Sequence, residues 1–173
     1  MSKHETPMTE GFWESQAPGL FFAEYQLVKR GADRSRRLVD GLILPDEPNG
    51  RGKWRDHIPL TDKRVIVIQA KARPYRMGMY LMGQALFSAR LARLVCGAAS
   101  VRSILLCHDT DSALLPLLKP FPEVEVWLSD PKNPRQCKNG LTEIRAQARP
   151  VGAKRIAANI AKLPGVSRRA KTP

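Results

Sequence analysis

The chain has 173 residues, 43% of them hydrophobic, and a formal net charge of +13. This length suits one ordinary domain that buries a core, followed by a tail. No run of about 18 uninterrupted apolar residues occurs, and the first residues lack the layout of a secretory signal. We therefore expect a cytoplasmic protein without a membrane segment. Cys96, Cys107 and Cys137 lack the close pairing of a zinc site and are interpreted as free thiols.

The positive charge is concentrated at one end of the chain. Residues 1–130 have a balance of +3, whereas residues 131–173 carry 11 Lys and Arg against the single acid Glu143. We expect an α/β domain over 1–130 and a basic tail over 131–173, with a linker and a short helix from 151 to 163. A basic tail is typical of a chain that meets nucleic acid, because each Lys or Arg at a phosphate releases a counterion. The alternative is a tail that only keeps the protein soluble.

The first predicted elements are a short helix over residues 10–16 and an extended segment over 20–28. Residues 1–9 are polar and are expected to be loose, and Pro18-Gly19 marks a break. Aromatic and branched residues favour a strand over 20–28, although a helix end also fits. If this segment is extended, Glu24 shares a face with Phe22 and Gln26. Glu24 is then either a metal-site carboxylate or an exposed acid that pairs with a nearby arginine.

The next strand, residues 36–45, carries one acid, Asp40, in an otherwise apolar run. An unpaired Asp in a strand covered on both faces costs several kcal/mol unless a cation or a donor compensates it. We interpret Asp40 as a metal ligand, with a structural ion pair as the alternative. Residues 46–62 then form a long polar connection. Its basic-aromatic cluster either contacts nucleic acid or pins the loop to the domain; the cluster comprises Arg51, Lys53, Trp54, Arg55 and His57.

A second apolar run, residues 65–71, ends in Gln69-Ala70-Lys71. Side chains two apart on a strand share a face, so Gln69 and Lys71 are expected to project together, with the Ala70 carbonyl between them. If Asp40 lies on the neighbouring strand, one hard cation could bind Asp40, the Gln69 amide oxygen and the Ala70 carbonyl. Lys71 would then serve the attacking water and the phosphate, and the cation would acidify that water.

Beyond this run, a helix is predicted from about residue 77 to 96, with an apolar stripe of Met79, Met82, Leu86, Ala89 and Leu94. Tyr80, Gln84 and Ser88 are spaced by four and are expected to share another face, either at the metal site or in solvent. A buried strand over 101–107, a helix over 112–118 capped by Thr110 or Asp109, and a strand over 124–128 follow. His108, Asp109 and Asp111 are interpreted as a capping turn in preference to a metal cluster.

These elements predict a mixed sheet flanked by helices. Residues 20–28 and 36–45 should form a hairpin, and the later strand-helix-strand order should give a parallel crossover. An Asp on one strand followed by Gln-x-Lys on the next resembles the signature of the PD-(D/E)xK nuclease superfamily, and the Gln variant is similar to that of Mrr-type restriction enzymes. Glu24 and Gln84 stand where many members have a further carboxylate and a helix Gln.

The resemblance implies a restriction-endonuclease-like fold and Mg²⁺- or Mn²⁺-dependent hydrolysis of DNA. It implies that Asp40, Gln69, Ala70 and Glu24 hold the metal, that Lys71 is catalytic and that Gln84 assists. Because Gln lowers the negative charge of the triplet, a non-catalytic nucleic-acid-binding or interaction module on the same fold stays open, as does an assembly subunit. Two-fold dimers are common among enzymes that cut both strands, so a homodimer is compatible with this interpretation. The expected nucleic-acid contacts are Arg36, Arg37, Arg51, Lys53, Trp54, Arg55, Arg73 and Arg76.

Overall fold

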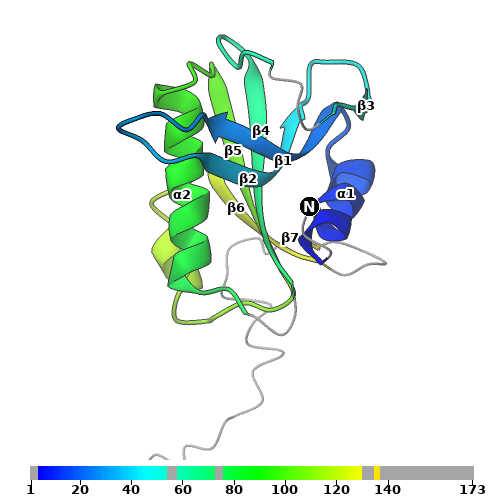
Figure 1. The fold of residues 1–173 in the computed structure, drawn as a ribbon. Helices are drawn as coiled ribbons and strands as arrows, with labels where there is room; N and C mark the ends of the chain where they lie inside the picture. Colours follow the sequence, from blue (N-terminus) through cyan, green and yellow to red (C-terminus); the bar gives the residue numbers. More distant parts are fainter. Residues whose placement is uncertain (1–3, 54–57, 73–75, 130–134, 137–173) are drawn as a thin grey trace, which may run out of the picture. The chain divides into compact units, whose positions relative to one another are not determined.

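The computed structural model describes residues 4–53, 58–72, 76–129 and 135–136 (Figure 1). The described residues all fall within one compact unit, residues 1–140. Several sequence-based predictions lie outside the described residues: those for Trp54, Arg55, His57 and Arg73, and the expected helix at 151–163.

A mixed seven-stranded sheet forms the centre of this unit, in the order β3-β1-β2-β4-β5-β6-β7. The hairpin partners β1 and β2 are antiparallel, as are β2 and β4, whereas β4, β5 and β6 run parallel. Both the predicted hairpin and the predicted parallel crossover are therefore confirmed. The strands are β1 (Leu20–Val28), β2 (Arg37–Leu44), β3 (Gly50–Arg51), β4 (Arg64–Lys71), β5 (Ser100–Cys107), β6 (Val124–Leu128) and β7 (Arg135–Gln136).

Two helices cover the opposite faces of the sheet, α1 (Glu5–Gln16) and α2 (Met79–Leu94) (Figure 1). Alternate residues of β4 feed the two cores: Val65 and Val67 pack in the core that includes Ala92 of α2, and Ile66 and Ile68 in the core that includes Phe12 of α1. We call these the α2-side core and the α1-side core. Neither helix is long and apolar enough to cross a membrane, and the described residues contain no other candidate span.

Helix α1 begins at Glu5, five residues before the predicted start. The polar residues that suggested a loose segment, Thr6 and Thr9, are buried instead. Thr9 satisfies its hydroxyl within the helix by donating to the Thr6 carbonyl at 2.9 Å. The first turns of this helix were not predicted because its buried face has threonine at positions where an apolar residue is usual.

In α2 the observed buried face differs from the predicted stripe. Met82 and Ala89 are buried as expected, but Met79 and Leu94 are 73% and 76% exposed. The predicted row of Tyr80 and Ser88 also divides, since Tyr80 is exposed and Ser88 is buried. Small residues make up most of the face against the sheet, so hydrophobicity alone does not identify it; the buried residues are Leu81, Met82, Ala85, Ser88, Ala89 and Ala92.

The segment after β5 contains a 3₁₀ turn, Leu115–Leu118, where a helix over 112–118 was predicted. Asp111 closes the turn that precedes it, because its Oδ1 accepts hydrogen bonds from the backbone N–H groups of Ala113 and Leu114 at 2.8 and 3.2 Å. The prediction of Thr110 or Asp109 as the cap was wrong, since the 3₁₀ turn has Leu114 at its N-cap and no side-chain cap. Pro116 stands in the first turn of this element, where proline is tolerated. In a helix that began at residue 112, it would lie further inside and lack the donor for the carbonyl four residues before it.

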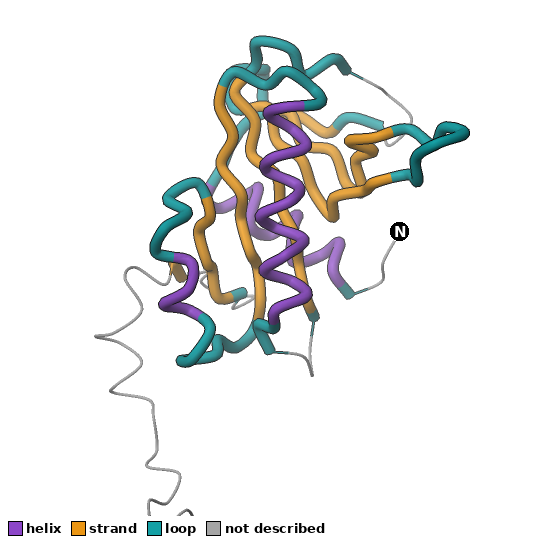
Figure 2. Tube along the Cα trace, turned by 90° about the vertical axis from the view of Figure 1, so that its left-hand side faces the viewer, coloured by secondary structure: helices purple, strands orange, loops and turns teal. Residues whose placement is uncertain are grey.

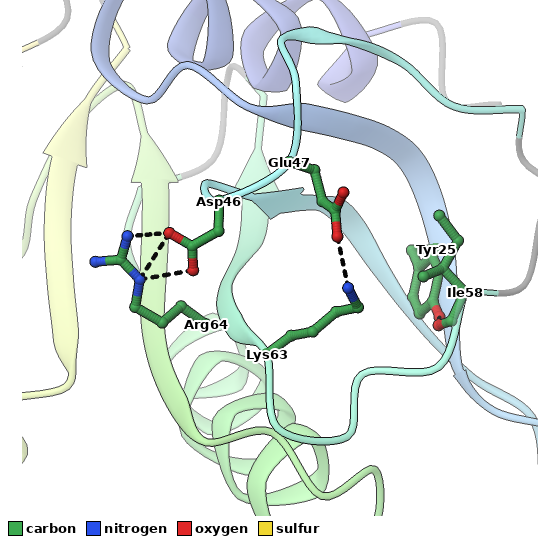
Figure 3. Close-up of polar contacts among 6 residues, drawn as sticks. All are labelled: Tyr25, Asp46, Glu47, Ile58, Lys63 and Arg64. Atoms are coloured by element: carbon green, nitrogen blue, oxygen red, sulfur yellow. Dashed lines mark hydrogen bonds and ion pairs between the residues drawn. The ribbon is translucent and has the colours of Figure 1, made fainter.

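The long connection between β2 and β4 is held to the domain by polar contacts at its two ends (Figure 3). At the sheet end, Arg64 donates to both carboxylate oxygens of Asp46, and Lys63 lies 2.5 Å from Glu47. Further along the connection, the Tyr25 hydroxyl donates to the Ile58 carbonyl at 2.6 Å. These contacts hold the connection against the strands that it joins and against β1.

Candidate functional site

Asp40 lies where strands β2 and β4 separate. Their paired register ends at Gly41 and Ile68. Beyond this pair, the Asp40 side chain takes the place of a backbone acceptor. Its Oδ2 accepts a hydrogen bond of 2.7 Å from the Ala70 backbone N–H. The carboxylate is thereby fixed against the middle residue of Gln69-Ala70-Lys71.

The side-chain alternation of both strands of the hairpin breaks at this point. Phe22 and Tyr25 are three residues apart and yet pack in the same α2-side core, and so do Val39 and Leu42 on β2. On β1 the break coincides with Glu24, whose φ of 53° is in the left-handed region. A non-glycine residue rarely adopts this conformation, and doing so costs on the order of 1 kcal/mol or more. Glu24 therefore does not continue the face of Phe22, because the strand is not regularly extended there.

Helix α1 brings Glu5 to the same place. A Cβ added at Gly41 would lie 3.3 Å from the Thr9 Cβ, so the glycine next to Asp40 allows the helix to approach β2 closely. Glu5, in the first turn, forms an ion pair of 3.1 Å with the Lys71 ammonium. Glu5 was not among the predicted site residues. Only a helix that starts at residue 5 could have suggested it, and the sequence pattern did not reveal that start.

We call Glu5, Glu24, Asp40 and Lys71 the Asp40 cluster. Burial raises the pKa of Asp40 to about 6; the Ala70 N–H and the Lys71 charge lower it, and the charges of Glu5 and Glu24 raise it further. The carboxylate is therefore ionised at neutral pH but at a cost. An added cation would reduce this cost by interacting with the charged form.

Gln69 makes its contact on the α2 side of the sheet. It is 2% exposed, and its Nε2 donates to the Ser88 Oγ of α2 at 2.9 Å. Lys71, two residues later, reaches Glu5 of α1 on the other side. The expected shared face is thus not reflected in their contacts, because Lys71 is the last residue of β4 and its long side chain extends to the other helix.

The other predicted site residues are dispersed over the described surface. The Gln84 amide lies 3.5 Å from the Tyr80 hydroxyl on the outer side of α2. Arg36, Arg37 and Lys53 are exposed, while Arg51 pairs with Glu10 and Arg76 lies 2.8 Å from Asp109. Among the described residues, no three His, Cys, Asp or Glu side chains are grouped so as to hold a metal ion.

Comparisons with known proteins returned no match among family models, curated proteins or solved structures.

Proposed function

We propose that the protein is a Mg²⁺-dependent nuclease of the PD-(D/E)xK type that hydrolyses phosphodiester bonds in DNA. The observation that carries the proposal is the Asp40 carboxylate, held on the Ala70 amide between Gln69 and Lys71. The order of elements also supports it: a helix, antiparallel strands that include the Asp40 strand, the Gln-Ala-Lys strand, a helix and a parallel strand. The acid and the lysine of the superfamily signature are expected on these two strands.

The residues present suit a hard cation with few protein ligands. Mg²⁺ is commonly bound by one or two carboxylates, with water and substrate phosphate oxygens completing its shell. Asp40, whose pKa burial has raised, is the first ligand on this proposal, and Glu24, an acid whose charge acts on it, is the second. When bound, the metal would polarise the phosphate and acidify a water. This assignment replaces Gln69 as a ligand, since its amide contacts Ser88.

Lys71 is the proposed catalytic cation of the chain itself. Its side chain is 39% exposed, so the ammonium can contact a phosphate in solvent while its Glu5 partner is 19% exposed. In this arrangement Glu5 is a positioning residue: it directs the lysine toward Asp40 and favours the charged ammonium. Arg36 and Arg37 are exposed at the start of the strand that carries Asp40, where they could hold the backbone of the DNA.

The second candidate function is a non-catalytic nucleic-acid-binding module on the same fold. It is favoured by the burial of Gln69 against Ser88 and by the lack of a grouped set of three metal-binding side chains among the described residues. On this alternative the Asp40 cluster has only a structural role at the end of the hairpin, where Asp40 accepts the Ala70 N–H. The positive charges would then act without a metal, and binding would weaken with salt.

A cleavage assay separates the two functions. Purified protein is incubated with linear, circular and single-stranded DNA in Mg²⁺, Mn²⁺ or EDTA, beside Asp40→Ala and Lys71→Ala. We expect metal-dependent cutting that falls by roughly 10²-fold or more in both variants. Lys63→Ala is the matched control, because Lys63 also pairs with a glutamate but lies at the opposite end of β4. Full cutting by a folded Lys71→Ala protein would refute the nuclease site; metal-independent DNA binding without cutting would favour the module.

A further inference from the structure

Helix α2 carries a row of large apolar side chains on the side that faces away from the sheet. Tyr80, Phe87 and Leu94 are spaced by seven residues and are 78%, 71% and 76% exposed. Seven residues are nearly two helical turns, so these three side chains lie on one side of α2. That side is opposite the buried residues such as Ala85 and Ala92. Figure 2 shows α2 lying over the sheet on the near side, with no described element covering it. We call Tyr80, Phe87 and Leu94 the outer stripe.

The amount of apolar surface on α2 is large for a helix that faces only water. Met79 and Val95 flank the outer stripe and are 73% and 61% exposed. With aromatic side chains burying about 150–250 Å² each, these five residues expose on the order of 600 Å². A standard interface buries about 800 Å² per partner, so the surface is most of what one stable contact needs. Seven residues is also the repeat at which paired helices present one position of each heptad to each other.

We propose that a second copy of this chain covers the outer stripe, with the two α2 helices antiparallel about a two-fold axis at Phe87. Such an axis pairs residues that lie equally far from position 87 on its two sides. The stripe satisfies this rule, because Tyr80 and Leu94 are each seven residues from Phe87. Between them, Gly83 has open space where a Cβ would be, and it faces a large residue of the other copy. The resulting pairs are Phe87 with Phe87, Tyr80 with Leu94, Gly83 with Leu91 and Gln84 with Arg90.

The charges of α2 favour an antiparallel over a parallel pair. The helix contains Arg90 and Arg93 and no acidic residue. In a parallel pair each arginine would lie beside the same arginine of the second copy. In an antiparallel pair the arginines of the two copies lie at opposite ends of the interface. Arg90 already lies 3.5 Å from Glu123 of its own chain, which offsets its charge at the rim. Arg93 would lie close to Tyr80 of the second copy, where a guanidinium can stack on the ring.

The mass of the full-length chain in solution tests the proposal, by sedimentation equilibrium at micromolar concentrations. We expect a dimer for the natural sequence and a monomer for Phe87→Glu and for Leu94→Glu. Leu117→Glu is the matched control: Leu117 is 56% exposed but lies on the 3₁₀ turn, so this variant should stay dimeric. A monomeric natural chain would overturn the proposal. A dimer that persists in folded Phe87→Glu would also overturn it. The same holds if that dimer dissociates only when residues 141–173 are deleted.

Cross-linking tests the axis itself, in a background of Cys96→Ser and Cys137→Ser. Residue 87 faces its own copy, so Phe87→Cys alone should form an intermolecular disulfide. Tyr80→Cys alone should not, but a mixture of Tyr80→Cys and Leu94→Cys chains should cross-link, since facing positions come within the reach of a disulfide. Cross-linking of Tyr80→Cys with itself and not with Leu94→Cys would contradict the antiparallel arrangement. Neither test depends on nuclease activity.

Discussion

Replacing Asp40 by asparagine should make the protein more stable at neutral pH. Burial raises the pKa of Asp40 from 3.8 to about 6, and each pKa unit corresponds to about 1.4 kcal/mol. Between these two values the folded protein binds more protons than the unfolded chain, so its stability falls as pH rises and levels off above pH 6. The ionised carboxylate therefore costs about 3 kcal/mol at pH 7 or above. Asparagine removes this cost, and its carbonyl can still accept the Ala70 N–H.

The expected gain for Asp40→Asn is about 1–3 kcal/mol at pH 8, because the new amide N–H₂ loses some solvation. For a chain of this size that is roughly 3–10 °C in Tm. Thermal and urea unfolding, followed by circular dichroism from pH 4 to pH 8, should show the two proteins converging near pH 4. Asp33→Asn is the control, since Asp33 is exposed and the change in charge is the same. An Asp40→Asn protein that is no more stable at pH 8, or that keeps the natural pH slope, would refute the reasoning.

Three other substitutions test the packing around the site. Gly52→Ala would place a Cβ 2.0 Å from the buried Phe22 ring, and we expect a loss of about 1–3 kcal/mol in urea unfolding. Ser88→Ala would leave the buried Gln69 amide without its acceptor, and a loss of about 1–3 kcal/mol should appear in the same assay. Burial and the nearby Cys96 raise the pKa of Tyr25 to about 12. Tyr25→Phe should therefore lose about 1 kcal/mol at pH 7 but should no longer lose stability between pH 10 and 12.

The sheet could be predicted because its strands have strong local signals. The runs at 65–71 and 101–107 are apolar and β-branched, and they are separated by a helix-length segment, so both their extended state and their parallel pairing follow from the sequence. The faces of the helices were harder to predict. In α1, threonines occupy buried positions, and in α2 alanines and a serine do so while large apolar residues are exposed. A rule that places the most hydrophobic residues inside finds Phe12, Leu81 and Met82 but misses the other buried positions of both helices.

The site was predicted in part. The odd acid in an apolar strand predicted a cation or a donor at Asp40; the structure shows a donor, the Ala70 backbone N–H, which together with the Lys71 charge offsets only part of the effect of burial. The contribution of Glu5 could not be predicted, since it depends on how α1 lies on the sheet. The shared face of Gln69 and Lys71 was expected from the strand, and β4 does stay paired with β5 through Lys71. Their contacts differ because β2 has left β4 before Lys71, and the long lysine side chain reaches Glu5 of α1.

That separation also gives one backbone amide an unusual partner. The Ala70 proton is held by a side chain that titrates, whereas a regular ladder would hold it with a carbonyl. Its chemical shift in a ¹⁵N correlation spectrum should therefore follow the protonation of Asp40, with a midpoint near pH 6. A cation that binds the carboxylate would move this midpoint to lower pH. A single amide resonance could thus report both the ionisation and the occupancy of the site in the unmodified protein.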